Sequence, residues 1–217
     1  GKRQIDRDKV HVAIRRMDHE YALSLLDEAL DMLSEAELAR LVNGFLDPAK
    51  LRPDRKGKGG LPAEVKAFEK ASLAGEYYEG FNVNSKNCRE KSVGTRAWIA
   101  ECERFFSRCV AAVGENDPAD VCRAFDILLS LLDQIDECRD DIVFFADEGG
   151  SWQVGVDWAK VLPAWFTCLP ATAEPEEYAR RVIEVVSKHQ AYWRDKHLAK
   201  ARRIATPAQR KALREMS

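Results

Sequence analysis

The sequence predicts an all-α fold, and two observations lead to this prediction. Apolar residues recur at steps of three and four over most of the 217 residues, which is the period of an amphipathic helix. Short turns containing proline or glycine separate the helical segments, so that consecutive segments form pairs. We therefore expect a solenoid-like helical-hairpin array, with a compact irregular helical bundle as the alternative.

The N-terminal part begins with a helical stripe that runs from Val10 through Tyr21 to Leu33. Ser34 and Glu37 then form a Ser-x-x-Glu capping box, which marks the start of another helix. Residues 47–61 follow with two prolines, three glycines and a cluster of basic side chains. We expect one domain over residues 1–217, and this basic loop is where an N-terminal helix pair would separate from the rest.

A helical hairpin is predicted in the middle of the chain. Residues 92–113 carry one apolar stripe, and residues 118–135 carry the next. The turn at residues 114–118 is so short that the two helices must pack antiparallel. Residues 142–145 are the one strand-like run, and they are interpreted as a helix end or an extended link.

Helices are also expected throughout the C-terminal third. A short apolar helix ends at Pro170, and a long one carries Tyr178, His189 and Trp193 before it continues into basic sequence. The pair Thr206-Pro207 has the residue types of an N-cap and a first helical position, so a last short helix begins there.

The formal charge of −2 conceals two oppositely charged blocks. Residues 115–148 hold 11 acidic and 2 basic side chains, a net charge of −9. Residues 188–217 hold 9 basic and 2 acidic side chains, a net charge of +7. Such blocks bear on partners and association rather than on fold. The two blocks neutralise each other within one molecule, neutralise each other across a dimer, or are each neutralised by another partner.

The composition excludes several classes of protein. With 46% hydrophobic residues the chain is not disordered, and no apolar run approaches the roughly 20 residues that cross a bilayer. The six cysteines show no Cys-x-x-Cys spacing and lie mostly in apolar helical segments. They suit buried thiols in a reducing compartment, so we expect a cytoplasmic protein without a membrane partner.

An acidic group on one helix face is the first candidate site. Asp133, Asp136, Glu137 and Asp140 follow the spacing i, i+3, i+4 and i+7. Such carboxylates are solvated or paired internally, contact a protein partner, or bind Mg²⁺ or Mn²⁺. No second carboxylate set accompanies them, and we assign no catalytic residue, cofactor or metal ligand from the sequence.

Aromatic residues and histidines provide the next candidates. Trp152 and Trp158 mark either a dense core or a ligand groove between residues 145 and 165. His189 lies on an apolar stripe, which favours a core histidine. His189 and His197 would be about 12 Å apart on one continuous helix, too far to share a metal ion.

The basic C-terminus offers possible anion-binding residues, namely Lys200, Arg202, Arg203 and Arg210. They form a solvated helix end, contact the acidic block, or neutralise the phosphates of a nucleic acid. Tyr192 and Trp193 lie just upstream, on or near the stripe that we expect to be buried.

The order of features from about Glu20 to His189 is similar to the helical region that accompanies SWIM zinc fingers in some bacterial proteins. The segments that carry the resemblance are LLDEALDMLSEAELARLVNGFLDP, WIAECERFFSRCVAAVGENDPADVCRAFDILLSLLDQIDE, DDIVFFADEGG and PEEYARRVIEVV. The zinc-finger motif, Cys-x-Cys followed by Cys-x-His, is absent from this chain. The resemblance therefore implies an α-helical, repeat-like accessory domain and transfers no zinc, nucleic-acid or residue role.

The function that these observations favour is a non-enzymatic protein-interaction or scaffold module with an acidic or aromatic helical surface. Its partner would be another protein or a second copy of the chain. One alternative is a metal-dependent hydrolase that uses the acidic face. The other is nucleic-acid binding through the basic C-terminal helix.

Overall fold

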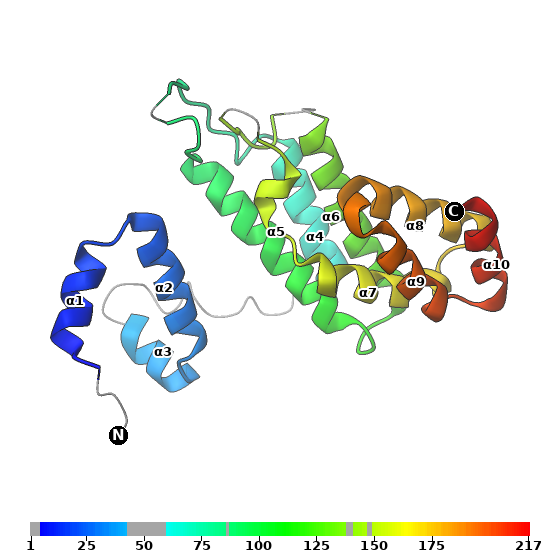
Figure 1. Cartoon of the computed structure of the whole chain (residues 1–217), viewed down its shortest axis with the longest axis horizontal. Coiled ribbons are helices and arrows are strands. Elements are labelled where there is room, and N and C mark those ends of the chain that lie inside the picture. The colour runs from blue at the N-terminus through cyan, green and yellow to red at the C-terminus, as the bar shows by residue number, and fades with distance from the viewer. Residues whose placement is uncertain (1–4, 43–59, 86, 138–140, 147–148) are drawn as a thin grey trace. The chain divides into compact units, whose positions relative to one another are not determined.

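The all-α prediction is confirmed by the computed structural model, which describes residues 5–42, 60–85, 87–137, 141–146 and 149–217 (Figure 1). Within these ranges the secondary structure is helical, and one isolated antiparallel bridge joins Lys91 to Phe145. The chain divides into an N-terminal unit, Gly1–Arg55, and a C-terminal unit, Lys56–Ser217. The boundary falls inside the basic segment 47–61, most of which lies outside the described residues.

The described part of the N-terminal unit contains α1 (Arg7–Arg15), α2 (His19–Asp31) and α3 (Glu35–Val42). The single apolar stripe of the sequence is thus divided between two helices. The division follows from Asp18, a residue type favoured just before a helix, whose carbonyl accepts the Ala22 N–H at 2.9 Å. At the start of α3, Glu37 Oε2 accepts the Ser34 N–H at 3.0 Å, as the capping motif predicts.

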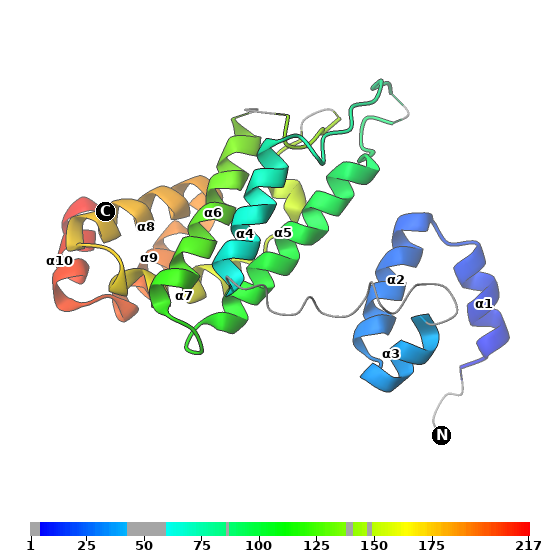
Figure 2. The same cartoon turned by 180° about the vertical axis from the view of Figure 1, so that it is seen from behind.

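Three long helices form the first part of the C-terminal unit: α4 (Gly60–Leu73), α5 (Val93–Ala112) and α6 (Pro118–Asp136). Figures 1 and 2 show them packed side by side, and the predicted hairpin corresponds to α5 and α6. Asp117 caps α6 by accepting the Ala119 N–H at 2.7 Å. The side chains between these helices include the fully buried Trp98, Phe125 and Leu128, so the main core lies here.

The segment between α4 and α5 packs tightly against the first turn of α5. A Cβ atom on Gly94 would lie 2.3 Å from the Tyr77 carbonyl oxygen, so only glycine allows this approach. Thr95 Oγ1 donates a hydrogen bond to the Phe144 carbonyl at 2.8 Å. Residues 142–145 are therefore an extended link that lies against α5, and not the end of a helix.

Shorter helices complete the C-terminal unit. In order they are η1 (Ser151–Val154), α7 (Trp158–Cys168), η2 (Leu169–Ala171), α8 (Pro175–His189), η3 (Ala191–Trp193), α9 (Arg194–Ile204) and α10 (Pro207–Met216). Helix α7 contacts α5, α6 and α9, and α10 packs on α8. The predicted start of the last helix is confirmed, because Thr206 and Gln209 form a capping box.

The prediction of one long helix through His189 and Trp193 is wrong. The backbone of Gln190 leaves the helical region with φ of −140° and ψ of 41°, and α9 begins only at Arg194. His189 and His197 consequently lie on different helices. The distance argued for a continuous helix does not apply to them.

Candidate functional site

The acidic side chains of α6 make contacts within the molecule. Asp133 Oδ1 lies 2.9 Å from Lys188 Nζ and 3.1 Å from His189 Nε2. Asp136 accepts hydrogen bonds from the Ser151 N–H and hydroxyl, both at 2.7 Å. Glu137 Oε1 lies 3.8 Å from Lys188 Nζ. Asp140 is outside the described residues.

These contacts favour the internally paired alternative for the three described carboxylates. Burial alone would raise the pKa of Asp133, but hydrogen bonds from His189 and Lys188 lower it overall. Asp133 therefore stays ionised and joins α6 to the end of α8. Because Lys188 begins the basic block, the two charged blocks meet at this point.

The side chain of His189 is buried, as expected for a core histidine. Its ring stacks on Trp158, with centroids 4.8 Å apart and planes inclined by 18°. Trp158 is thus part of the packing around Asp133, whereas Trp152 is an exposed residue on η1. Within the part of the chain that the structure describes, no three or more His, Cys, Asp or Glu side chains gather as a metal site would require.

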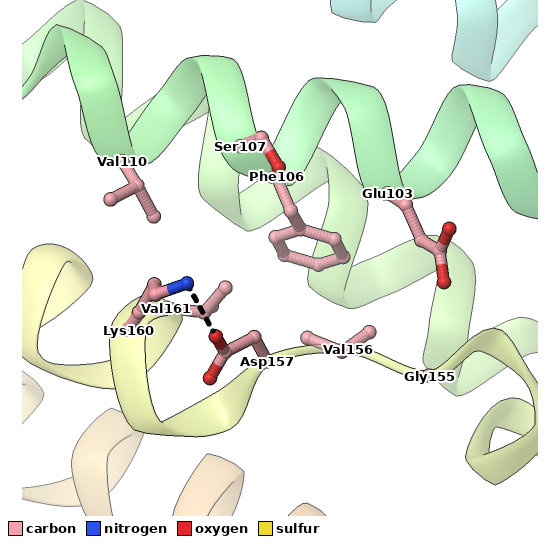
Figure 3. Close-up of a pocket in the computed structure, with 9 residues that line it drawn as sticks. All are labelled: Glu103, Phe106, Ser107, Val110, Gly155, Val156, Asp157, Lys160 and Val161. Atoms are coloured by element: carbon pink, nitrogen blue, oxygen red, sulfur yellow. Dashed lines mark ion pairs between the residues drawn. The ribbon is translucent and has the colours of Figure 1, made fainter. Parts of the chain in front are cut away.

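A pocket of about 390 Å³ lies between α5 and the start of α7 (Figure 3). It falls partly in the segment 145–165 where the sequence placed a possible groove, although Trp152 and Trp158 do not line it. The lining residues are Glu103, Phe106, Ser107, Val110, Gly155, Val156, Asp157, Lys160 and Val161.

The polar groups of this pocket come from two elements. Asp157 and Lys160 form an ion pair at 3.0 Å, and a hydrogen bond from Lys160 lowers the pKa of Asp157. Across the pocket, partial burial raises the pKa of Glu103, while the charge of Lys91 opposes that rise. The pocket therefore offers the Glu103 carboxyl, the solvent-exposed ion pair of Asp157 and Lys160 and the Ser107 hydroxyl, which are groups that can form hydrogen bonds with a small polar molecule.

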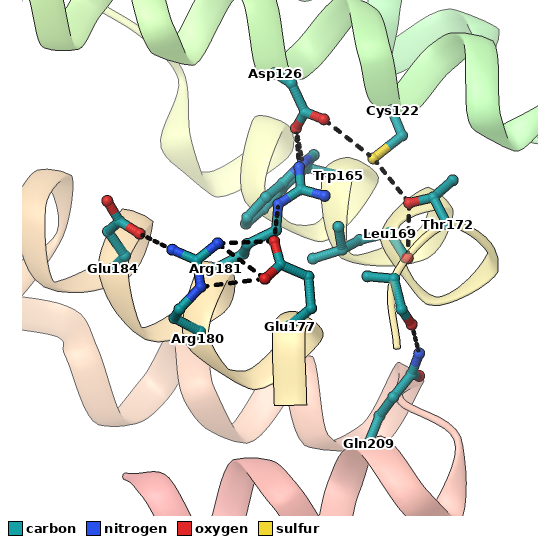
Figure 4. Close-up of polar contacts among 11 residues, drawn as sticks. Cys122, Asp126, Trp165, Leu169, Thr172, Glu177, Arg180, Arg181, Glu184 and Gln209 are labelled. Atoms are coloured by element: carbon teal, nitrogen blue, oxygen red, sulfur yellow. Dashed lines mark hydrogen bonds and ion pairs between the residues drawn. The ribbon is translucent and has the colours of Figure 1, made fainter. Parts of the chain in front are cut away.

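A polar network centred on Asp126 was missed by the sequence analysis (Figure 4). Asp126 Oδ1 accepts a hydrogen bond from Trp165 Nε1 at 3.1 Å and pairs with the Arg181 guanidinium. Nearby, the Thr172 hydroxyl lies 3.4 Å from Cys122 Sγ. These residues join α6, α7 and α8. They are far apart in the sequence, so no local sequence pattern indicates that they are in contact.

The cysteines of the described residues are free, and four of them are buried. A hydrogen bond with the Cys168 thiol lowers the pKa of Cys122 against the effect of burial, and the same contact raises the pKa of Cys168. Cys88 is half-buried, and Cys138 lies outside the described residues.

The four basic candidates of the C-terminus divide into two groups. Arg210 turns inward and donates to the carbonyls of Arg202 and Ala205, and Arg202 donates to the Ser217 hydroxyl. Lys200 is half-buried on α9, and Arg203 is exposed on the same helix. Of these four candidates, Lys200 and Arg203 form no side-chain hydrogen bond or ion pair with a described residue.

The expectation that Tyr192 and Trp193 lie on or near a buried stripe is wrong. Their side chains are 87% and 52% exposed, because α8 ends before them and η3 turns them away from the core.

The described N-terminal helices expose most of their apolar residues. We define the N-terminal apolar surface as the large hydrophobic side chains that are exposed in residues 5–42, namely Ile5, Val10, Val12, Met17, Tyr21, Leu23, Leu25, Leu26, Met32 and Leu41. None of the described side chains in residues 5–42 is buried. The predicted stripe between Val10 and Leu33 includes Tyr21 but not Ile5 or Leu41.

Comparison with known protein families, with curated proteins and with solved structures finds no match to this chain. In the residues that the structure describes, no helix combines the length and the apolar character needed to cross a membrane.

His197 gives a testable pH dependence. The residue is buried, its Nδ1 has no hydrogen-bond partner among the residues that the structure describes, and burial together with Lys200 and Lys196 lowers its pKa. Near and below about pH 6.5 the unfolded state therefore binds more protons at this residue than the folded state does, so the free energy of unfolding falls as the pH decreases through that value. Replacing His197 with leucine should reduce this loss by up to about 1.4 kcal/mol per pH unit.

Urea titrations of the wild type and His197→Leu between pH 7.5 and 5.5 measure this effect. His197→Gln keeps a polar side chain without a titrating group, so it should flatten the pH dependence as leucine does. Parallel curves for all three proteins would contradict the prediction.

Proposed function

We propose that this protein is a non-enzymatic α-helical interaction module whose N-terminal apolar surface binds an amphipathic helix of a protein partner. The observation that carries the proposal is that ten large hydrophobic side chains are exposed in residues 5–42, where no described side chain is buried. Exposed apolar side chains that share one side of a helix, as Tyr21 and Leu25 do on α2, mark interaction sites in soluble proteins.

The lengths of the helices support the same proposal. Helices α1, α2 and α3 have 9, 13 and 8 residues, and isolated helices of these lengths are marginal in water. Their stability must come from burying their apolar faces. On α2, Tyr21 and Leu25 follow one another at a spacing of four, so they present one face along the helix. Such a face accepts a partner helix that contributes its own apolar side chains.

The C-terminal unit gives less support to the other functions considered. Asp133 and Asp136 already have intramolecular partners, so an acidic interaction surface or a divalent-metal hydrolase would have to displace those contacts. The free, buried cysteines suit a reducing environment, and we include a cytoplasmic location in the proposal.

Site-specific photo-crosslinking in native cells tests the proposal. A photoreactive residue replaces Leu25 in the full chain, and a matched control replaces Val93, an exposed hydrophobic residue on α5. We expect position 25 to crosslink a second protein through a helical segment, and position 93 not to capture that protein.

The captured segment is then synthesised as a peptide, and its affinity for the full chain is measured. Tyr21→Asp combined with Leu25→Asp should weaken binding roughly 100-fold or more, because burying each side chain contributes about 1.5–3 kcal/mol. Crosslinks only within the same chain, or only to a second copy, would refute the partner proposal. A lower melting temperature of the isolated double variant would show independently that the surface packs on its own chain.

A further inference from the structure

Exposed aromatic rings and cations adjoin one another at the start of α9. Tyr192 is 87% exposed and Trp193 is 52% exposed, and their ring centroids lie 4.9 Å apart with the planes at 89°. Lys196 Nζ lies 5.2 Å from the centroid of the Trp193 ring. We call Tyr192, Trp193, Lys196, Lys200 and Arg203 the aromatic–basic surface.

The helical spacing places the three cations on one side of α9. Lys196, Lys200 and Arg203 are at i, i+4 and i+7, so they form a line about 10 Å long that starts beside the aromatic rings. The buried residues of α9 are His197, Leu198 and Ala201, which lie on the opposite side. Tyr192, Trp193, Lys196 and Arg203 are therefore exposed and Lys200 is half-buried, while α9 is anchored by its other face.

The positive charge of this surface is not neutralised within the described part of the chain. Lys188 and Lys211 are paired with carboxylates, whereas Lys196, Lys200 and Arg203 form no ion pair with a described residue. The charges of Lys200 and Lys196 also act on the buried His197, where, after burial itself, they contribute to lowering its pKa. The surface thus carries an excess of positive charge beside the exposed carboxylate of Asp195, which lines the same depression.

An open depression of about 420 Å³ lies against residues 191–196, beside the two aromatic rings. It is lined by Ala191, Tyr192, Trp193, Arg194, Asp195 and Lys196. A flat ring system that enters this depression can stack on the Tyr192 side chain, which is 87% exposed, whereas the Trp193 ring already contacts Tyr192 and Lys196. Lys196, Lys200 and Arg203 then lie along the path that the phosphate backbone would follow away from the stacked base.

We propose that the aromatic–basic surface binds single-stranded nucleic acid. A base stacks on the exposed Tyr192 ring beside Trp193, and the phosphates contact Lys196, Lys200 and Arg203. A duplex fits this surface poorly, because its bases are stacked on one another and their faces are not free. An acidic peptide would use the cations and leave the exposed aromatic faces unused, so the observations favour the nucleic acid.

Fluorescence anisotropy with the full chain tests this proposal. The probes are a labelled 15-nucleotide single strand, as DNA and as RNA, the duplex of the same sequence, and a poly-glutamate peptide of equal charge as competitor. We expect at least one single strand to bind more tightly than the duplex. For three phosphate contacts, the slope of log K against log salt should be about −2.

Two variants and one control separate stacking from charge. Tyr192→Ala should weaken single-strand binding about tenfold. It should leave the slope of log K against log salt unchanged, because base stacking releases no counterions from the phosphates. Lys200→Gln should reduce the magnitude of the slope by about 0.7. Lys211→Gln makes the same charge change at an exposed residue of α10 and should alter neither quantity.

Three results would overturn the proposal. The first is a duplex that binds as tightly as both single strands. The second is an affinity unaffected by Tyr192→Ala, and the third is poly-glutamate competing as well as the unlabelled oligonucleotide. The last result would indicate an acidic protein as the ligand. Circular dichroism confirms that each variant is folded, which is expected because the substituted side chains lie outside the core.

Discussion

Replacing Trp98 with alanine is expected to lower the free energy of unfolding of the C-terminal unit by about 3–5 kcal/mol. The Trp98 side chain is fully buried among α4, α5 and α6, and its ring centroid lies 5.5 Å from that of Phe68. Its Nε1 also donates to the Ser72 hydroxyl at 2.8 Å. The substitution therefore removes apolar burial, leaves a cavity and breaks a buried hydrogen bond. Urea titration followed by far-ultraviolet circular dichroism measures the change.

Two further variants show which part of the Trp98 side chain matters. Trp98→Phe keeps most of the apolar contact and removes the indole N–H, so it should cost about 1–3 kcal/mol. Trp152→Ala removes a tryptophan that is 73% exposed and should change the stability by less than about 0.5 kcal/mol. Equal losses for Trp98→Ala and Trp152→Ala would contradict the assignment of the core to the space between α4, α5 and α6.

The helical class and several helix starts could be predicted because they depend on residues close together in the sequence. Asp117 before Pro118 and Thr206 before Pro207 are local signals, and both cap helices in the structure. The antiparallel pairing of α5 with α6 followed from the short turn between them, where Gly114 adopts a φ of +86°. Local chemistry was sufficient for these features.

The break between α8 and α9 could not be predicted, because it depends on packing between distant segments. Residues 190–196 contain neither proline nor glycine, and the apolar period continues through them. In the structure His189 is held by Asp133 and Trp158, whereas His197 and Leu198 are buried on α9. The chain must change direction between these two anchors, and this change exposes Tyr192 and Trp193.

The candidate sites were partly predictable for the same reason. Asp133 and Asp136 lie in the last turn of α6 and Glu137 is its C-cap, but the partners of these side chains come from η1 and α8. Asp126 carried no signal at all, since an isolated carboxylate on a helix usually faces solvent. Its partners lie 39 and 55 residues further along the chain, at Trp165 and Arg181.

Replacing Asp126 with alanine is expected to lower the free energy of unfolding by about 2–4 kcal/mol. The Trp165 side chain is almost completely buried, so its Nε1 would lose its acceptor in a place that water does not readily reach. Arg181 would also lose its counter-charge on α6. The Arg181 side chain is 21% exposed and that of Asp126 is 37% exposed, so solvent screens the ion pair between them. Removing this ion pair therefore costs less free energy than breaking a fully buried one.

The matched control for this variant is Asp120→Ala on the same helix. Asp120 pairs with Arg123 at 3.8 Å, and both side chains are more than half exposed, so the loss should stay below about 1 kcal/mol. Asp126→Asn retains an oxygen that can accept from Trp165 and should lose less stability than Asp126→Ala. Combining Asp126→Ala with Arg181→Met should cost less than the sum of the two single changes, because each one already breaks the shared ion pair. Additive losses, or an Asp126→Ala variant as stable as Asp120→Ala, would show that this network does not hold α6, α7 and α8 together.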